Sequence, residues 1–597
     1  MPGHSRAPFH GKVRRLTKLL LAAVVLVVFA RPVVSQGPDV IVVGAGPGGL
    51  AAALEAAHGG ARVTVVEMGS VFGGHAVVSE GGLSFAGTPL QRRLGIDDAP
   101  ETMFADIVKL GGDANPEWAR LFAERGIPEI HDWLVSLGVA FTSVQRPNGN
   151  SVPRFHENPR RGFGVVEPLY RAALATGAVE FVWCTRVTRL LVESGRVVGV
   201  EGTHERTGTR RTWRAASVVL ATGGFQSNLA LVKAHWPQED AVPARILIGA
   251  GVNAQGTGLD LATGAGAALE RLDHQWNYPR GVVDPRYPGA DRGLNVIFGT
   301  RFAWLNGRGE RIWAEKLADM LAQPGGRMVL LFDVHGRGDF RISGGDWVDR
   351  RRVDALLDNP AIARKANSLT ELAGVMGLPA DAVARTVERW NAMVASGEDT
   401  ELGLFSTSKG TFASPTGVRP RTVLTPPFHA VEVWPLTRKS MGGVAIDLNC
   451  RVLDQARRPI LGLYAAGEVA GFGGLNGRAS IEGAFIAPAM MQGRIAGRTI
   501  AAALGRSPLT TSAPAPTTRA DPAPAANACT TCHRIDQLLA SPRKGFWHFE
   551  RVHTRVNESK QACVECHAEM SPFRAGEHKF DRVAQIDTCA YCHVPRQ

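Results

Sequence analysis

The sequence predicts an α/β protein that ends in a small, mostly helical domain, and three observations carry this prediction. Residues 39–69, DVIVVGAGPGGLAAALEAAHGGARVTVVEMG, read as a strand, a glycine-rich turn, a helix and a second strand. Two later apolar segments, 218–225 and 459–471, also run into glycine turns. Residues 528–597 carry three copies of Cys-x-x-Cys-His and few large aliphatic side chains.

The first of these segments is a complete βαβ unit. The glycines of Gly44-x-Gly46-x-x-Gly49 let the backbone approach a pyrophosphate, which then lies at the N-terminus of the helix. Glu67 follows the second strand, where a carboxylate can accept the ribose hydroxyls. Strand, turn, helix and acid together predict a Rossmann-like dinucleotide-binding domain.

Three further stretches favour FAD over NAD as the dinucleotide. Residues 73–82, GGHAVVSEGG, place small side chains where a flavin ring needs close backbone approach. Residues 218–225, VVLATGGF, form a strand that ends in a glycine turn, and residues 459–471 form a strand that reaches Glu468, near the expected ribityl chain. The residues expected to contact FAD are Gly44, Ala45, Gly46, Gly48, Gly49, Glu67, Gly73, Gly74, His75, Ala76, Gly81, Gly82, Val187, Ala221, Thr222, Gly223, Gly467, Glu468 and Gly483.

The N-terminal 35 residues predict an export signal. Six basic residues and no acidic one precede Asp39, so this leader carries half of the net charge of +12. Its apolar stretch, residues 19–30, is too short to span a bilayer, which needs about 20 residues, but it suits a signal peptide. An uncleaved anchor is the alternative. No basic block with interleaved aromatic residues follows, which argues against a nucleic-acid partner.

The cysteine spacing predicts covalently bound haem. In a Cys-x-x-Cys-His motif two thiols bond the vinyl groups of one haem, and the histidine ligates its iron. Zinc is the competing explanation, but a zinc site does not require a histidine after every second cysteine. The haem-bonding cysteines are Cys529, Cys532, Cys563, Cys566, Cys589 and Cys592, and the adjoining ligands are His533, His567 and His593.

The histidines of the tail give a second count of the haems. Besides the three motif histidines the tail contains His548, His553 and His578, so three haems can each take two axial imidazoles. This predicts electron-carrying haems without an open position, unless one of these three histidines is a surface residue. The two lone cysteines, Cys184 and Cys450, are expected to be inert buried thiols.

These blocks, in this order, resemble the fumarate reductase/succinate dehydrogenase flavoprotein family, particularly its soluble periplasmic flavocytochrome c members, over roughly residues 38–508. They also resemble the ketosteroid dehydrogenases. The resemblance implies an α+β capping domain inserted into a discontinuous FAD domain, with substrate bound between them. The expected organisation is a signal peptide (1–35), an FAD-binding domain in two parts (38–271 and 430–508), the capping domain (272–429), a Pro/Ala-rich linker (509–527) and a trihaem cytochrome c domain (528–597).

The family's substrate residues are only partly present. The substrate-binding arginine has a match at Arg478 in GLNGRASIEG, whereas the histidine pair before MGG becomes Arg438 and Lys439, and the histidine near the start of the cap becomes Tyr278. We expect the arginines or Lys439 to bind an anionic or carbonyl-bearing substrate, and Tyr278 or Lys439 to exchange the proton. The alternatives are that Tyr278 only packs in the core and that Lys439 is a surface residue.

The expected function is FAD-mediated hydride transfer to or from a C–C bond next to a carbonyl or carboxyl group, in the periplasm. Only one dinucleotide fingerprint is visible, so the haems are expected to exchange electrons with a periplasmic or membrane-bound cytochrome, and only the signal segment to meet the membrane. Two alternatives stay open: a fumarate reductase with a rebuilt site, and an electron-transfer protein whose flavin has no substrate.

Overall fold

The computed structural model describes residue 3 and residues 37–506, apart from residues 148, 206, 238–239, 288, 298–300, 315, 344–349 and 406–419. The predicted signal peptide (except residue 3), the linker (509–527) and the trihaem domain, with all of its cysteines and histidines, lie outside the described residues. In the described part, no helix combines the length and the apolar character that a bilayer crossing requires.

A nine-stranded sheet forms the nucleotide-binding part of the molecule. Its strands follow the order β6-β2-β1-β10-β22-β8-β7, with β21 beside β22 and β9 beside β8, and the first five are parallel. The four residues of β1 are at most 5% exposed, as expected for a parallel strand covered on both faces. The bounds are β1 (Val40–Val43), β2 (Val63–Val66), β6 (Val179–Val182), β7 (Thr185–Glu193), β8 (Arg196–His204), β9 (Arg210–Arg214), β10 (Ser217–Leu220), β21 (Arg451–Leu453) and β22 (Pro459–Ala465).

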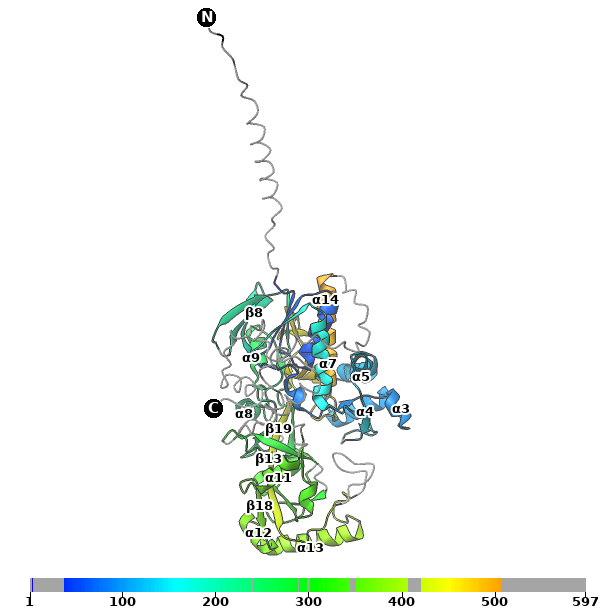
Figure 1. The fold of residues 1–597 in the computed structure, drawn as a ribbon, viewed down its shortest axis with the longest axis vertical. Coiled ribbons are helices and arrows are strands. Elements are labelled where there is room, and N and C mark those ends of the chain that lie inside the picture. Colours follow the sequence, from blue (N-terminus) through cyan, green and yellow to red (C-terminus); the bar gives the residue numbers. More distant parts are fainter. Residues whose placement is uncertain are drawn as a thin grey trace.

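Helices α2 (Pro47–His58) and α14 (Ile486–Leu504) pack against each other beside this sheet, and α7 (Arg161–Ala175) also contacts α2 (Figure 1). Two glycines of α14 permit the close approach. A Cβ atom on Gly493 would lie 2.1 Å from the Gly48 carbonyl oxygen, and one on Gly497 would lie 2.5 Å from that of Ala52. The helix that follows the fingerprint is therefore fixed from behind by the last described helix of the chain.

An eight-stranded sheet forms the second part of the molecule, in the lower half of Figure 1. Its strands follow the order β15-β16-β19-β13-β14-β17, with β11 and β18 both paired to β19, and helices α12 and α13 lie at its far end. The bounds are β11 (Leu247–Ile248), β13 (Gln275–Val283), β14 (Gly293–Ile297), β15 (Ala303–Leu305), β16 (Met328–Phe332), β17 (Arg341–Ile342), β18 (Ala363–Ala366), β19 (Phe428–Ser440), α11 (Arg350–Asp358), α12 (Leu369–Met376) and α13 (Ala380–Ser396).

Strand β19 connects the two parts. It pairs with β16 and β18 at its start and with β13 as far as Ser440, so the boundary expected between residues 429 and 430 falls inside a continuous strand. At its end the Ser440 amide donates to Glu468 Oε1 (2.9 Å), and the Ser440 hydroxyl accepts from the Phe225 amide (3.0 Å). The residues just before Ser440 are thereby placed against the ends of the first sheet.

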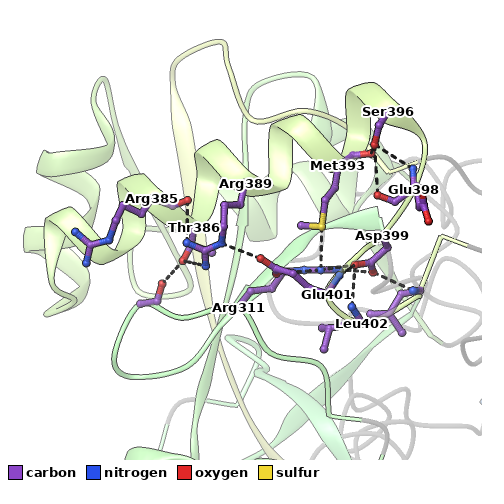
Figure 2. Close-up of polar contacts among 12 residues, drawn as sticks. Arg311, Arg385, Thr386, Arg389, Met393, Ser396, Glu398, Asp399, Glu401 and Leu402 are labelled. Atoms are coloured by element: carbon purple, nitrogen blue, oxygen red, sulfur yellow. Dashed lines mark hydrogen bonds and ion pairs between the residues drawn. The ribbon is translucent and has the colours of Figure 1, made fainter.

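A buried ion pair anchors the far end of the second part (Figure 2). The guanidinium of Arg311 donates to both oxygens of Asp399 at 2.6 Å, and the two side chains are 3% and 0% exposed. Asp399 also accepts from the amides of Glu401, Leu402 and Leu404. One carboxylate therefore organises the turn that follows α13.

Smaller elements complete the described chain. These are β3 (Leu83–Ser84), β4 (Ser143–Gln145), β5 (Phe155–Glu157), β12 (Leu269–Glu270), β20 (Gly443–Val444), α3 (Pro89–Arg93), α4 (Pro100–Gly111), α5 (Pro116–Gly126), α6 (Asp132–Ser136), α8 (Leu229–Ala234), α9 (Thr257–Gly264), α10 (Leu317–Leu321), the π-helical turn η2 (Ile127–His131), and the 3₁₀ turns η1 (Gly74–Val78), η4 (Pro324–Gly326), η5 (Gly336–Asp339), η7 (Gly467–Val469) and η8 (Gly471–Gly474).

Candidate active site

A cavity of about 330 Å³ lies where the two sheets meet. Four parallel strands of the first sheet contribute the residues at or just after their carboxyl ends, namely Val43, Val66, Ala221 and Ala466. The second sheet contributes side chains of β13, β14 and β19. A crevice at the carboxyl ends of parallel strands is where open α/β sheets bind their ligands.

The fingerprint glycines perform distinct steric tasks in this cavity. Gly44 has φ 106° and would bring a Cβ atom within 2.4 Å of the Ala221 carbonyl oxygen, and a Cβ atom on Gly49 would lie 1.9 Å from the Gly44 oxygen. Gly46 is different, because a Cβ atom there would meet nothing within 4 Å. It lines the cavity at the N-cap of α2, so this open space fits a pyrophosphate at the helix N-terminus.

Glu67 fixes the loop around this cradle. Its carboxylate accepts the amides of Ala45 and Gly69, each at 2.7 Å. Burial raises the pKa of Glu67, although these amides oppose the shift. Each carboxylate oxygen keeps further acceptor capacity, so the expected contact with a ribose hydroxyl fits the arrangement.

Most of the predicted FAD-contacting residues are brought together. The cavity is lined by Gly44, Gly46, Gly48, Glu67, Gly74, His75, Ala76, Gly81, Gly82, Val187, Ala221, Thr222, Gly223, Gly467, Glu468 and Gly483. Ala45, Gly49 and Gly73 are not among the lining residues, although Ala45 is bonded to Glu67 through its amide and Gly49 packs against Gly44.

Tyr278, Arg438 and Lys439 meet at the end of the cavity next to the second sheet. The Tyr278 hydroxyl donates to Glu482 Oε1 at 2.6 Å, and the residue as a whole is only 7% exposed. The Lys439 Nζ lies 6.0 Å from the centre of this ring and 3.7 Å from that of Phe485. The Arg438 guanidinium donates to the Gly249 carbonyl oxygen at 2.9 Å. All three side chains line the cavity.

Burial sets the protonation of these groups. It lowers the pKa of Lys439 to about 8, with the Arg438 charge acting in the same direction and the charges of Glu482 and Glu468 opposing. It raises the pKa of Tyr278 above its ordinary range, and Glu482 reinforces this shift. It also raises the pKa of Glu468 to about 7, against the Ser440 amide and the two cations. The cavity therefore contains a neutral phenol beside an amine that titrates near neutral pH.

Arg478 lies elsewhere. Its side chain is not among the cavity-lining residues, is 46% exposed, and has its Nη2 3.1 Å from an oxygen of Asp273. Its Nε is 3.8 Å from Asp113, which also lies 2.8 Å from the His274 Nε2 and 4.0 Å from a guanidinium nitrogen of Arg271. The structure thus brings together three of the four predicted catalytic residues and places Arg478 in a cluster of opposite charges on the outside of the glycine-rich turn.

Sequence reasoning missed Glu482, Arg280 and Asn295, which all line the cavity. Glu482 directly precedes Gly483, a predicted FAD contact, and this adjacency would have allowed Glu482 to be predicted as a cavity residue. Arg280 follows Tyr278 by two positions on β13, and its guanidinium carbon lies 5.5 Å from the centre of the Tyr278 ring. No local pattern marks Asn295, which reaches the cavity because β14 pairs with β13.

Residues 39–486 match the protein family described as FAD binding domain. The chain belongs to this family. A KsdD-like steroid dehydrogenase of Mycobacterium tuberculosis is 31% identical over 539 residues, which cover 77% of this chain and 95% of that protein. A fumarate reductase (cytochrome) of Shewanella frigidimarina is 31% identical over 478 residues, covering 78% and 77%, and a urocanate reductase of Eggerthella lenta is 30% identical over 483 residues, covering 78% and 74%.

Solved structures show the same relationship. The open conformation of a flavocytochrome c3 fumarate reductase aligns with a TM-score of 0.63 at 28% identity, covering 84% of this chain and 82% of that one. The 3-ketosteroid-Δ4-(5α)-dehydrogenase of Rhodococcus jostii RHA1 aligns with a TM-score of 0.57 at 26% identity, covering 78% and 96%. The predictions of a mixed α/β fold, of FAD as cofactor and of an FAD-dependent oxidoreductase acting on CH–CH groups are confirmed.

Proposed function

We propose that this chain is a periplasmic flavocytochrome c that moves hydrogen to or from a C–C bond next to a carbonyl or carboxyl group. The chemical step of the proposal depends on one observation: Lys439 lines the same cavity as the fingerprint glycines, and burial there lowers its pKa to about 8. Bound FAD exchanges two electrons with the substrate as a hydride. The protein must then supply a proton-exchanging group at the neighbouring carbon, and Lys439 is suited to that task.

Lys439 acts on the proton in both directions. In dehydrogenation its neutral amine accepts the proton from the carbon next to the carbonyl, and in reduction its ammonium returns a proton to that carbon. A pKa near the working pH keeps both forms populated. The face of Phe485, 3.7 Å from Nζ, stabilises the ammonium when it forms.

Tyr278 and Glu482 position and polarise this lysine. Because the phenol stays protonated and its hydroxyl donates a hydrogen bond to Glu482, that carboxylate is fixed beside the cavity. Its charge favours the ammonium form of Lys439, whereas Arg438 favours the amine. Arg438 is also the group that binds the carbonyl or carboxyl oxygen of the substrate, since its guanidinium lines the cavity within 5.6 Å of the Tyr278 ring centre.

Electrons reach or leave the flavin through three c-type haems attached to the C-terminal motifs, and a periplasmic or membrane-bound cytochrome is the partner. Three Cys-x-x-Cys-His motifs and six histidines support this assignment, and so does the likeness to a fumarate reductase named as a cytochrome. The export signal predicted at residues 1–35 supports a periplasmic location, where haem is attached to such motifs.

The test is turnover by the purified holoprotein. A panel of α,β-unsaturated acids and ketones with reduced viologen, and of their saturated forms with ferricyanide, is compared between wild type, Lys439→Met and Lys365→Met. Lys365 is the matched control, because it lies on β18 at the other end of β19, outside the cavity.

We expect at least one pair to be turned over, with Lys439→Met slowed by about 100-fold or more and Lys365→Met unchanged. Turnover of fumarate alone would instead identify a fumarate reductase with a rebuilt site. Absence of turnover across the panel would identify an electron-transfer protein whose flavin has no substrate.

A further inference from the structure

The cavity is strongly cationic on the side that the second sheet provides. Its described lining residues there include Arg280, Arg438 and Lys439, and none of the residues from β13, β14 and β19 that line it is acidic. The Arg280 guanidinium carbon lies 5.5 Å from the centre of the Tyr278 ring, and that of Arg438 lies 5.6 Å from it. Two guanidinium groups therefore flank the ring whose hydroxyl contacts Glu482.

A third arginine lies directly behind them. Arg292 donates to the Ala250 carbonyl oxygen at 2.7 Å, next to the Gly249 oxygen that accepts from Arg438. Burial lowers the pKa of Arg292, and the charge of Arg438 acts in the same direction. Asp284 and Tyr287 act in the opposite direction, and the Tyr287 ring centre lies 5.8 Å from the guanidinium carbon of Arg292. Arginine stays protonated in proteins, so Arg292 adds a positive charge behind Arg438 that favours an anion at this end of the cavity.

Asn295 adds an independent sign of a polar ligand. It lines the cavity and is 8% exposed, and its side-chain Oδ1 has no hydrogen-bond partner among the described residues. Buried polar atoms are almost always hydrogen-bonded, so this amide is suited to a group that arrives with the ligand. Rotation of the amide presents either its oxygen or its nitrogen to that group.

The rest of the cavity wall around Lys439 is apolar or acidic rather than cationic. Phe472, Phe485 and Ile486 supply its apolar part, and the carboxylate of Glu482 also lines the cavity there. A second carboxylate on the substrate would meet Glu482, and Arg478, which would have been its partner, lies outside the cavity. The wall thus favours one anionic group attached to an apolar body.

We propose that Arg280, Arg438 and Asn295 form a carboxylate subsite, and that the substrate is a monocarboxylic acid with an apolar body rather than a dicarboxylate or a neutral ketone. The chemistry assigned to this acid rests on the proposed function, whereas its binding does not. The carboxylate lies against the guanidinium groups, which leaves the adjoining carbons beside Tyr278 and Lys439.

Equilibrium binding to the oxidised holoprotein tests this subsite without turnover. The readout is the perturbation of the flavin absorption band by trans-cinnamate, by its neutral analogues cinnamamide and methyl cinnamate, by fumarate and by 4-androstene-3,17-dione. The variants are Arg280→Met and the control Arg245→Met. The guanidinium carbon of Arg245 lies 4.9 Å from the ring centre of Trp434 on the second sheet, and Arg245 does not line the cavity.

We expect cinnamate to bind wild type at least about tenfold more tightly than each of the other four compounds. Arg280→Met should raise the Kd of cinnamate by about tenfold or more and leave that of cinnamamide within about twofold, and Arg245→Met should change neither. If Arg280→Met loses its flavin, the wild-type comparison of the acid with its amide and ester decides alone.

Equal binding of cinnamate and cinnamamide would overturn the subsite, as would tighter binding of fumarate or the steroid, or an equal effect of Arg280→Met on acid and amide. Failure of the proposed function has a different signature. In that case the acid is still preferred over the amide in binding, but no member of the turnover panel reacts.

Discussion

The titration of Lys439 can be shifted in both directions by substituting its two charged neighbours. Burial lowers its pKa from 10.5 to about 8. At pH 7 this raises the neutral fraction from about 3 in 10,000 to about one in ten. Glu482→Gln removes the largest charge that opposes the shift, and Arg438→Gln removes a charge that reinforces it. A single nearby charge moves a buried pKa by about 1–3 units.

The assay is the pH dependence of kcat/KM in the oxidative direction, which reports groups of the free enzyme and in which the neutral amine is the active form. Wild type should rise to a plateau with an apparent pKa near 8. Glu482→Gln should move this apparent pKa down by about one unit, and Arg438→Gln should move it up by a similar amount. Gln keeps an acceptor for the Tyr278 hydroxyl, so Glu482→Gln alters the charge with little change of shape.

Glu398→Gln is the control, since Glu398 follows α13 at the far end of the second sheet (Figure 2) and does not line the cavity. Its profile should match wild type. An identical apparent pKa in Glu482→Gln, Arg438→Gln and wild type would refute the assignment of this titration to Lys439. So would an unchanged profile in Lys439→Met.

Three further outcomes are expected. Gly46→Val fills the open space at the α2 N-cap without backbone strain, because φ is −72°. The purified variant should keep the circular dichroism of wild type but bind FAD at least about tenfold more weakly. A wild-type FAD content would contradict this. Arg311→Met leaves the buried Asp399 without its ion-pair partner and should lower the free energy of unfolding, measured in urea, by about 3–5 kcal/mol. Arg389→Met removes a half-exposed ion pair and should lower it by less than about 1 kcal/mol. Equal losses in the two variants would contradict this. Pyridine haemochrome analysis should give three haems per chain, and His533→Ala should leave one of them high-spin; one or two haems would contradict the motif count.

The nucleotide-binding part was predictable because its determinants are local. The four apolar residues of β1, the glycines at the turn and Glu67 lie within 30 residues, and each has a steric or bonding task that its residue type reveals. Cys184 and Cys450 were likewise predicted to be buried, and they are.

The substrate end depends on contacts between distant segments. Tyr278 and Glu482 are 204 positions apart and meet only because β13 and the glycine-rich turn converge on one cavity. Arg478 was predicted from its offset along that turn, but the orientation of its side chain is decided by Asp273 and Asp113, which come from other segments. An offset gives the position of a residue on a turn and not the direction in which its side chain leaves it.

The extent of β19 is another long-range property. Its thirteen residues form one strand because β13, β16 and β18 all pair with it, so the strand continues past residue 430 into the site. Arg438 and Lys439 follow each other on this strand, and both line the cavity where the pairing of β19 with β13 shifts register between Leu436 and Lys439. Strand alternation alone would have placed them on opposite faces.

Anaerobic stopped-flow spectroscopy of the dithionite-reduced holoprotein mixed with trans-cinnamate tests the central claim most directly. The account predicts that the flavin band reappears as the acid is reduced, that the haem α-bands oxidise afterwards, and that Lys439→Met slows the first phase by about 100-fold or more. The account would be contradicted if the flavin stayed reduced in the presence of the acid, or if the haems oxidised in the absence of the acid. It would also be contradicted if the rate of the first phase were unchanged in Lys439→Met.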